Sequence, residues 1–274
     1  MKSELAEMAL NQQRTKPDDM PEAVPVPHAL VPHLDQTAIL LDIDGTLLEL
    51  MPTPREVWVP PGLSDTLNRL TERTSGALAL VSGRSLNDID LIFAPDVFSA
   101  VGGHGAELRL SVGDDAEDVP APPLDKELKR RLAAIAKLSP GILLEDKGYS
   151  LALHYRLAPH AEKAIYEAVA VIRADLPNAP IEVLPGKFVC EIKHSGFTKA
   201  TGVRELMTRE PFKGRRPIFI GDDVTDETVF AIMPDMNGLA FSVGRRAMGV
   251  NGHFDTPNDV REFLARLLDD TRLD

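Results

Sequence analysis

The chain has 274 residues, of which 43% are hydrophobic and 26% are charged, enough to build one large folded domain or two unequal ones. Its formal charge of −12, from 30 Lys and Arg against 42 Asp and Glu, argues against nucleic acid or an anionic membrane as the main partner. Cys190 is the single cysteine, which rules out an intrachain disulfide, and no apolar run approaches the roughly 20 residues of a membrane-spanning helix, so we expect a cytoplasmic protein.

Residues 1–35 are rich in proline, as in "KPDDMPEAVPVPHALVPHL", and lack periodicity, which predicts a largely disordered leader. From residue 38 onward, apolar runs that end in polar residues or glycine recur: "AILLDID", "ALALVSGR", "VFSAVGGHG", "RPIFIGDD" and "GLAFSVG". Such runs suit strands buried on both faces. Helical patterns such as "LSDTLNRLTER" and "TKATGVRELMTR" lie between them. The alternation predicts a Rossmann-like parallel α/β sheet with helices on both faces, built from residues 36–111 and 195–274.

Residues 112–194 follow another pattern, typical of an inserted α+β domain. Two amphipathic helices, "PPLDKELKRRLAAIAKL" and "PHAEKAIYEAVAVIRADL", flank a candidate hairpin, "GILLEDKGYSLALHYRL", and a strand, "GKFVCEIKH", follows them. Polar and apolar residues alternate along these strands, so one face of the sheet is charged and the other apolar. The periodicity by itself predicts helices on the apolar face and water on the charged face.

Asp42 and Asp44 follow the first apolar run, "AILL", in "AILLDIDGTLLEL". Side chains two apart on a strand point the same way, and ligands of open parallel sheets bind where the strands end. Gly45 allows a sharp turn at this position. Two adjacent carboxylates repel each other unless a cation or a proton is shared between them. The stretch alone fits either a Mg²⁺ site or a turn whose acids cap the next helix.

A second apolar run, in "PIFIGDDVTDETVF", also ends in carboxylates: Asp222 and Asp223, with Asp226 close behind. A helix N-terminus attracts acidic residues, but that does not explain why two separate strands both end in them. If both clusters lie at one edge of the sheet, a shared metal ion explains them better.

Two further positions suit a bound phosphate. Ser82 in "LVSGR" offers a hydroxyl beside backbone amides, and Lys199 in "GFTKA" offers a cation at the start of a helix. Taken alone, such a serine is usually a turn residue and such a lysine is usually solvent-exposed.

In this order, DIDGT, SGR, a lysine and GDDVTDE resemble the four motifs of the haloacid dehalogenase-like phosphatases. The resemblance implies that Asp42 attacks phosphorus, while Asp44 protonates the leaving oxygen and then activates water. It implies Mg²⁺ bound by Asp42, the Asp44 backbone carbonyl and Asp222, supported by Asp223 or Asp226. Ser82 and Lys199 would hold the phosphoryl oxygens. The other residues implied at the substrate are Gly45, Thr46, Gly83 and Arg84. Where glycine is expected after the motif lysine, this chain has Ala200.

The insert resembles the cap of trehalose-6-phosphate phosphatases in "EDK", "HYR" and "GKFVCE", and "GGHGAE" resembles the segment that leads into this cap. The resemblance implies that charged cap residues grip the sugar hydroxyls. These residues are Glu145, Lys147, Arg156 and Glu191, with His154 and Lys187 as weaker candidates. His104, in the segment that leads into the cap, is a further implied substrate-binding residue.

The expected function is hydrolysis of trehalose 6-phosphate by a monomeric enzyme. A related phosphatase acting on sucrose phosphate, mannosyl-phosphoglycerate or a hexose phosphate is the nearest alternative. A non-catalytic sugar-phosphate sensor belongs to a different class, and such a protein would be expected to have lost Asp42, Asp44 or Lys199, all of which are present.

Overall fold

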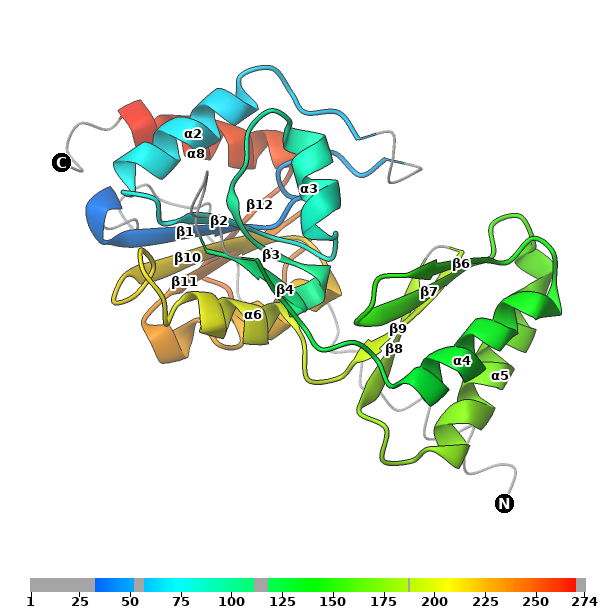
Figure 1. The fold of residues 1–274 in the computed structure, drawn as a ribbon. Helices are drawn as coiled ribbons and strands as arrows, with labels where there is room; N and C mark the ends of the chain where they lie inside the picture. The colour runs from blue at the N-terminus through cyan, green and yellow to red at the C-terminus, as the bar shows by residue number, and fades with distance from the viewer. Residues whose placement is uncertain (1–32, 52–56, 111–117, 187, 270–274) are drawn as a thin grey trace.

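The computed structural model describes residues 33–51, 57–110, 118–186 and 188–269, and two β-sheets organise them (Figure 1). The larger sheet has eight strands, parallel from β12 to β3, with β4 and β5 antiparallel at one edge. In spatial order the strands are β12 (Gly252–Phe254), β11 (Leu239–Val243), β10 (Arg216–Gly221), β1 (Thr37–Leu41), β2 (Leu78–Val81), β3 (Ser99–Gly102), β4 (Glu107–Arg109) and β5 (Asp118–Pro120).

Helices cover both faces of this sheet (Figure 1). The apolar core on one face includes residues of α2 (Leu63–Arg73), α3 (Leu86–Phe93) and α8 (Pro257–Asp269), and the core on the other includes residues of α6 (Lys199–Leu206) and α7 (Glu227–Phe230). In β1, Ile39 and Leu41 belong to the first apolar core, whereas Ala38 and Leu40 belong to the second. Both faces of β1 are therefore buried, which is why its sequence is continuously apolar. The predicted α/β fold is confirmed.

The smaller sheet is antiparallel, in the order β6–β7–β9–β8, and is built from β6 (Leu143–Asp146), β7 (Ser150–His154), β9 (Val189–His194) and β8 (Ile181–Gly186). Two helices, α4 (Lys126–Ala134) and α5 (Glu162–Asp175), pack on one face of it (Figure 1). Leu151, Leu153 and Ile192 form a buried core with Leu132 and Ile165 from these helices. The helices thus cover the apolar face, as the alternation predicts.

Some elements differ from the sequence-based expectation. The strand "GKFVCEIKH" begins only at Val189, because Phe188 has a positive φ of 60° and lies in the turn after β8. The sequence analysis did not predict β8, nor the three-residue strands β4, β5 and β12. The predicted boundary of the insert at residue 112 stays a prediction. β5, which follows this boundary in the chain, pairs with β4 in the larger sheet.

The leader prediction falls almost entirely outside the described residues. Of residues 1–35 only 33–35 are described, and Leu34 is buried in a 3₁₀ turn, Leu34–Gln36. Among the described residues, no helix combines the length and apolar character required to cross a membrane.

Candidate active site

Three neighbouring strands of the larger sheet end beside one another and carry the motif residues. β1 pairs in parallel with β10 on one side and with β2 on the other. Asp42 follows β1, Asp222 follows β10 and Ser82 follows β2. The carboxyl ends of parallel strands share one edge, so motifs far apart in the chain meet there.

Lys199 lies between two carboxylates. Its Nζ is 2.7 Å from Asp42 Oδ1 and 2.7 Å from Asp226 Oδ1, and the three side chains are 3%, 5% and 0% exposed, respectively. Lys199 is the first residue of α6, whose N-cap Thr198 accepts from the Thr201 backbone N–H. Burial alone would lower the Lys199 pKa, but the two carboxylates outweigh it and raise the pKa above its ordinary value. The lysine is therefore held as a cation at the end of β1.

The carboxylates of Asp42, Asp222 and Asp226 form a cluster that fits a metal ion. One oxygen from each lies within 4.8 Å of the others. Burial raises the pKa of Asp42 to about 6 and that of Asp222 to about 6, and repulsion between neighbouring carboxylates adds to both. A hard divalent cation with oxygen ligands would relieve this repulsion. Asp223 is exposed and lies outside the cluster, while its backbone N–H donates to Asp226 Oδ2 at 3.0 Å.

Gly45 and Thr46 fit closely against the cluster. The Thr46 hydroxyl donates to Asp42 Oδ2 at 3.1 Å and to Asp222 Oδ1 at 3.4 Å. Gly45 has a φ of +82°, and a Cβ there would lie 2.1 Å from Asp222 Oδ2. Glycine is therefore required for two reasons: the left-handed backbone and the space that the Asp222 carboxylate occupies.

Replacing Gly45 with alanine is expected to destabilise the metal-free protein by about 1–3 kcal/mol and to weaken Mg²⁺ binding, because Asp222 must move. Urea unfolding and the Mg²⁺-induced rise in Tm measure the two effects. Gly62→Ala is the matched control, since Gly62 has a φ of +81° but a Cβ added there would meet nothing within 4 Å. Equal losses in Mg²⁺ response for both variants would contradict the role of the Asp222 contact.

Asp44 and Arg84 form a bidentate ion pair. Arg84 Nε donates to Asp44 Oδ2 at 2.5 Å and Nη2 donates to Oδ1 at 2.6 Å. Ser82, two residues earlier, is buried, and its hydroxyl accepts from the Arg84 backbone N–H at 3.1 Å. The loop after β2 is thereby tied to the loop after β1.

His104 packs against the loop that follows β2. Its backbone N–H donates to the Ser82 carbonyl at 3.1 Å, and its ring fills the space beside Gly83, where a Cβ would lie 2.4 Å from His104 Cε1. His104 has a φ of +55°, and its buried Nδ1 has no hydrogen-bond partner among the described residues. Burial lowers the His104 pKa to about 4, so the ring is neutral near pH 7, although Glu191 of the smaller sheet acts in the opposite direction.

The charged face of the smaller sheet brings its predicted residues together in two groups. Glu145 Oε2 lies 2.8 Å from His154 Nε2 on the exposed hairpin. Glu191 Oε1 accepts from the Ser150 hydroxyl at 2.8 Å and lies 3.7 Å from Lys147 Nζ. The Arg156 guanidinium carbon lies 5.9 Å from the centre of the Phe188 ring. Lys187 is outside the described residues.

One residue near the acidic cluster was missed from the sequence. Arg245 Nε donates to the Asp222 backbone carbonyl at 2.7 Å, and Nη1 contacts Glu227 Oε1 at 2.7 Å. Arg245 lies just after the carboxyl end of β11, the strand next to β10. Because ligands bind at this edge of a parallel sheet, its position in the sequence could have identified it. The arginine fixes the backbone on which Asp222 is presented.

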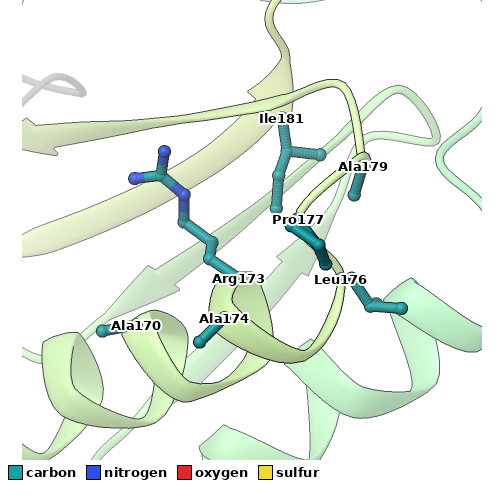
Figure 2. A pocket seen from close by; sticks show the side chains of 7 residues that line it. All are labelled: Ala170, Arg173, Ala174, Leu176, Pro177, Ala179 and Ile181. Atoms are coloured by element: carbon teal, nitrogen blue, oxygen red, sulfur yellow. The ribbon is translucent and has the colours of Figure 1, made fainter.

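The smaller sheet and helices α4 and α5 together form the smaller unit of the protein. A separate pocket lies on this unit, between the end of α5 and the start of β8 (Figure 2). Its volume is about 320 Å³, and the residues that line it are Ala170, Arg173, Ala174, Leu176, Pro177, Ala179 and Ile181. None of the candidate site residues lines this pocket, so it is distinct from the carboxylate cluster.

Comparison with known proteins gives a consistent result. The family model for trehalose-phosphatase matches residues 40–256. A Sinorhizobium fredii protein described as "Probable trehalose-phosphate phosphatase" is 41% identical over 218 residues, covering 79% of this chain and 81% of the relative. The trehalose-6-phosphate phosphatase of Escherichia coli is 37% identical over 228 residues, covering 83% and 85%. The C-terminal domain of C. albicans trehalose-6-phosphate phosphatase has a TM-score of 0.68 at 20% identity, covers 86% and 92% of the two chains, and supports the fold alone.

Proposed function

The chain belongs to the trehalose-phosphatase family, and from this premise we propose that it hydrolyses trehalose 6-phosphate to trehalose and phosphate, with Mg²⁺ as its cofactor. The observation that carries the proposal is the placement of Asp42 at the end of β1, in contact with Lys199 and within the carboxylate cluster. A buried carboxylate beside a fixed cation suits attack on a phosphoryl group.

In the first step, a carboxylate oxygen of Asp42 attacks phosphorus and the bond from phosphorus to the sugar oxygen breaks. Asp44 donates a proton to that leaving oxygen, which departs as the trehalose hydroxyl. Lys199, whose Nζ contacts Asp42 Oδ1, would offset the negative charge of the transferring group together with the Ser82 hydroxyl. The product of this step is an aspartyl-phosphate at Asp42.

In the second step, Asp44 removes a proton from a water molecule, and the water oxygen attacks phosphorus. The bond between phosphorus and the Asp42 oxygen breaks, which releases inorganic phosphate and restores the carboxylate. Asp44 suits both steps because its side chain is partly exposed, at 31%, beside the buried Asp42. One residue thereby serves first as acid and then as base.

For the metal, Asp42, Asp222 and the backbone carbonyl of Asp44 are the proposed ligands, with Asp226 in support. The exposed position of Asp223 favours Asp226 for the supporting role. When bound, Mg²⁺ would neutralise charge on the phosphoryl oxygens.

The smaller unit is proposed to act as a cap that selects the sugar. Glu145, Lys147, Arg156 and Glu191 are the proposed sugar ligands, with His104, His154 and Lys187 as additional candidates. The position of Tyr149, next to Ser150 in the chain, supports this role, because a Cβ at Gly103 would lie 2.4 Å from its hydroxyl oxygen. The neighbouring His104 packs against Gly83 in the loop after β2, the proposed phosphate loop. A sugar held by this face would lie next to the phosphate site.

Replacing Glu191 with glutamine is expected to lower kcat/KM for trehalose 6-phosphate by about ten- to a hundredfold, the worth of a charged hydrogen bond. Turnover of an aryl phosphate, which carries no sugar, should stay unchanged. The matched control is Glu167→Gln, an exposed glutamate on α5, the helix that covers the opposite face of the sheet. Equal losses on both substrates would show that Glu191 does not select the sugar.

Phosphate release tests the proposed function. Rates are compared for trehalose 6-phosphate, sucrose 6-phosphate, glucose 6-phosphate and an aryl phosphate, with Mg²⁺ and with chelator. We expect Mg²⁺-dependent turnover with a strong preference for trehalose 6-phosphate. Turnover without this preference would leave the catalytic assignment and remove the cap assignment, and no turnover on any substrate would favour a sugar-phosphate sensor.

We also propose that the chain acts as a monomer in the cytoplasm. The acidic composition and the single, buried Cys190 support this assignment. Analytical ultracentrifugation of the full chain tests the oligomeric state, and a stable dimer at micromolar concentration would contradict it.

A further inference from the structure

Asp44 lies in the loop after β1 and Arg84 in the loop after the adjacent strand β2, and the two side chains form a bidentate ion pair. We propose that Arg84 is a positioning residue that aligns Asp44 for proton transfer, instead of a ligand of the substrate phosphate. The proposal rests on the proposed function, because it requires Asp44 to act on the leaving oxygen and on water.

The contact fixes the plane of the Asp44 carboxylate. Nε and Nη2 of Arg84 each meet a different oxygen, at 2.5 and 2.6 Å. Two parallel hydrogen bonds from a planar guanidinium set both the position and the rotation of a carboxylate, which a single donor does not do. This edge of the guanidinium is occupied by Asp44, so it does not face a phosphate.

Arg84 is itself held in place. Its backbone N–H donates to the Ser82 hydroxyl at 3.1 Å, and its carbonyl accepts from the Gly103 N–H at 2.7 Å. Its side chain is 15% exposed, compared with 31% for Asp44. The arginine is therefore the more buried partner, and part of the Asp44 side chain stays accessible to a substrate.

The two catalytic carboxylates have separate partners. Asp42 accepts from Lys199 and Thr46, whereas Asp44 accepts from Arg84. Loss of the Arg84 side chain should therefore disturb Asp44 while the contacts of Asp42 remain. Loss of Arg84 is therefore expected to lower kcat with little change in KM, whereas loss of a phosphate ligand would raise KM.

The test compares Arg84→Gln and Arg84→Lys with wild type, using Arg204→Gln as control because Arg204 forms an exposed ion pair with Asp235. For Arg84→Gln we expect kcat on trehalose 6-phosphate to fall about 100-fold, the worth of one acid–base group, with KM within about threefold of wild type. Arg84→Lys should recover part of this loss, since one ammonium group replaces one of the two contacts.

4-Nitrophenyl phosphate separates the two steps. Its leaving group departs without a proton donor, so Asp42 is still phosphorylated, but hydrolysis of the aspartyl-phosphate still requires Asp44. Arg84→Gln should release about one nitrophenolate per active site rapidly and then turn over slowly. Beryllium fluoride, a mimic of the phosphoryl group on Asp42, should bind with wild-type affinity.

Two results would overturn the proposal. The first is a rise in KM of about tenfold or more, with weaker beryllium fluoride binding and unchanged kcat, which identifies Arg84 as a phosphate ligand. The second concerns an Asp44→Asn background: if Arg84→Gln still slows the nitrophenolate burst there, Arg84 does not act through Asp44. Wild-type turnover of trehalose 6-phosphate, measured in parallel, tests the proposed function separately.

Discussion

Replacing Asp42 with asparagine is expected to lower turnover of trehalose 6-phosphate by about 10⁴-fold or more, because the amide is a poor nucleophile at phosphorus. The change is nearly isosteric and keeps an oxygen within reach of Lys199 and Thr46, so the fold should persist. Phosphate release measures the loss, and thermal unfolding checks the fold.

Asp65→Asn serves as the control for the Asp42 substitution, since the Asp65 side chain is 74% exposed on α2. It should retain wild-type turnover. Activity of Asp42→Asn within about tenfold of wild type would contradict the role of Asp42 as the nucleophile.

Replacing Lys199 with methionine should have the second largest effect, on stability as well as on activity. The Lys199 ammonium is the cation shared by the buried Asp42 and Asp226 carboxylates. Its removal leaves two buried charges uncompensated, at a cost of about 3–5 kcal/mol in the metal-free protein. Loss of a charge that stabilises the transferring phosphoryl group should also lower kcat by about 10²–10³-fold.

The stability loss in Lys199→Met should grow with pH. Burial already raises the pKa of Asp42 to about 6 and that of Asp226 to about 7, and loss of the lysine removes the main interaction that lowers them. In the variant the two folded-state pKa values therefore lie above these figures, and the folded state holds protons that the unfolded state has already released. Its stability falls as pH rises from the unfolded pKa values toward the higher folded ones.

Urea unfolding in chelator at pH 5 and pH 8 measures this dependence for Lys199→Met, with the exposed Lys213→Met as control. We expect the larger destabilisation at pH 8. Equal destabilisation at both pH values would show that the two carboxylates do not depend on Lys199 for their charge.

The sequence predicts the central strands β1, β2, β3, β10 and β11 of the larger sheet well, because each contains a run of buried apolar residues. The short strands β4, β5 and β12 are only three residues long and carry no such run. The meeting of Asp42 and Asp222 also follows from the sequence, since parallel strands end at one edge. β8 was harder to predict because Pro180 and Pro185 border or interrupt its pattern, and proline is tolerated there because β8 lies at the sheet edge.

Side-chain partners could be predicted less well than strand positions. The sequence left Asp223 and Asp226 equivalent, but Asp226 is in contact with Lys199 while Asp223 is exposed. The motif implies that Arg84 binds the substrate, which stays a prediction, and it gives no sign of the ion pair between Arg84 and Asp44. Such pairings depend on rotamers and on loop geometry across strands, and neither leaves a periodic signal in the chain.

The segment that contains His104 contacts both the loop after β2 and the smaller unit. The left-handed backbone of His104 and the glycine on each side allow the ring to pack on Gly83, while the adjacent Gly103 leaves space for Tyr149 of the smaller unit. A Cβ at Gly103 would lie 2.4 Å from the Tyr149 hydroxyl oxygen. The "GGHG" segment is therefore where the proposed cap contacts the phosphate loop.

The central claim, covalent catalysis through Asp42, is tested most directly by trapping the intermediate. The enzyme is mixed with trehalose 6-phosphate and Mg²⁺, quenched within one turnover and reduced with borohydride, which converts an aspartyl-phosphate to homoserine. Peptide mass spectrometry should find homoserine at position 42 in the wild type and none in Asp42→Asn. Full turnover with aspartate unchanged at position 42, or with homoserine at another position, would contradict the mechanism.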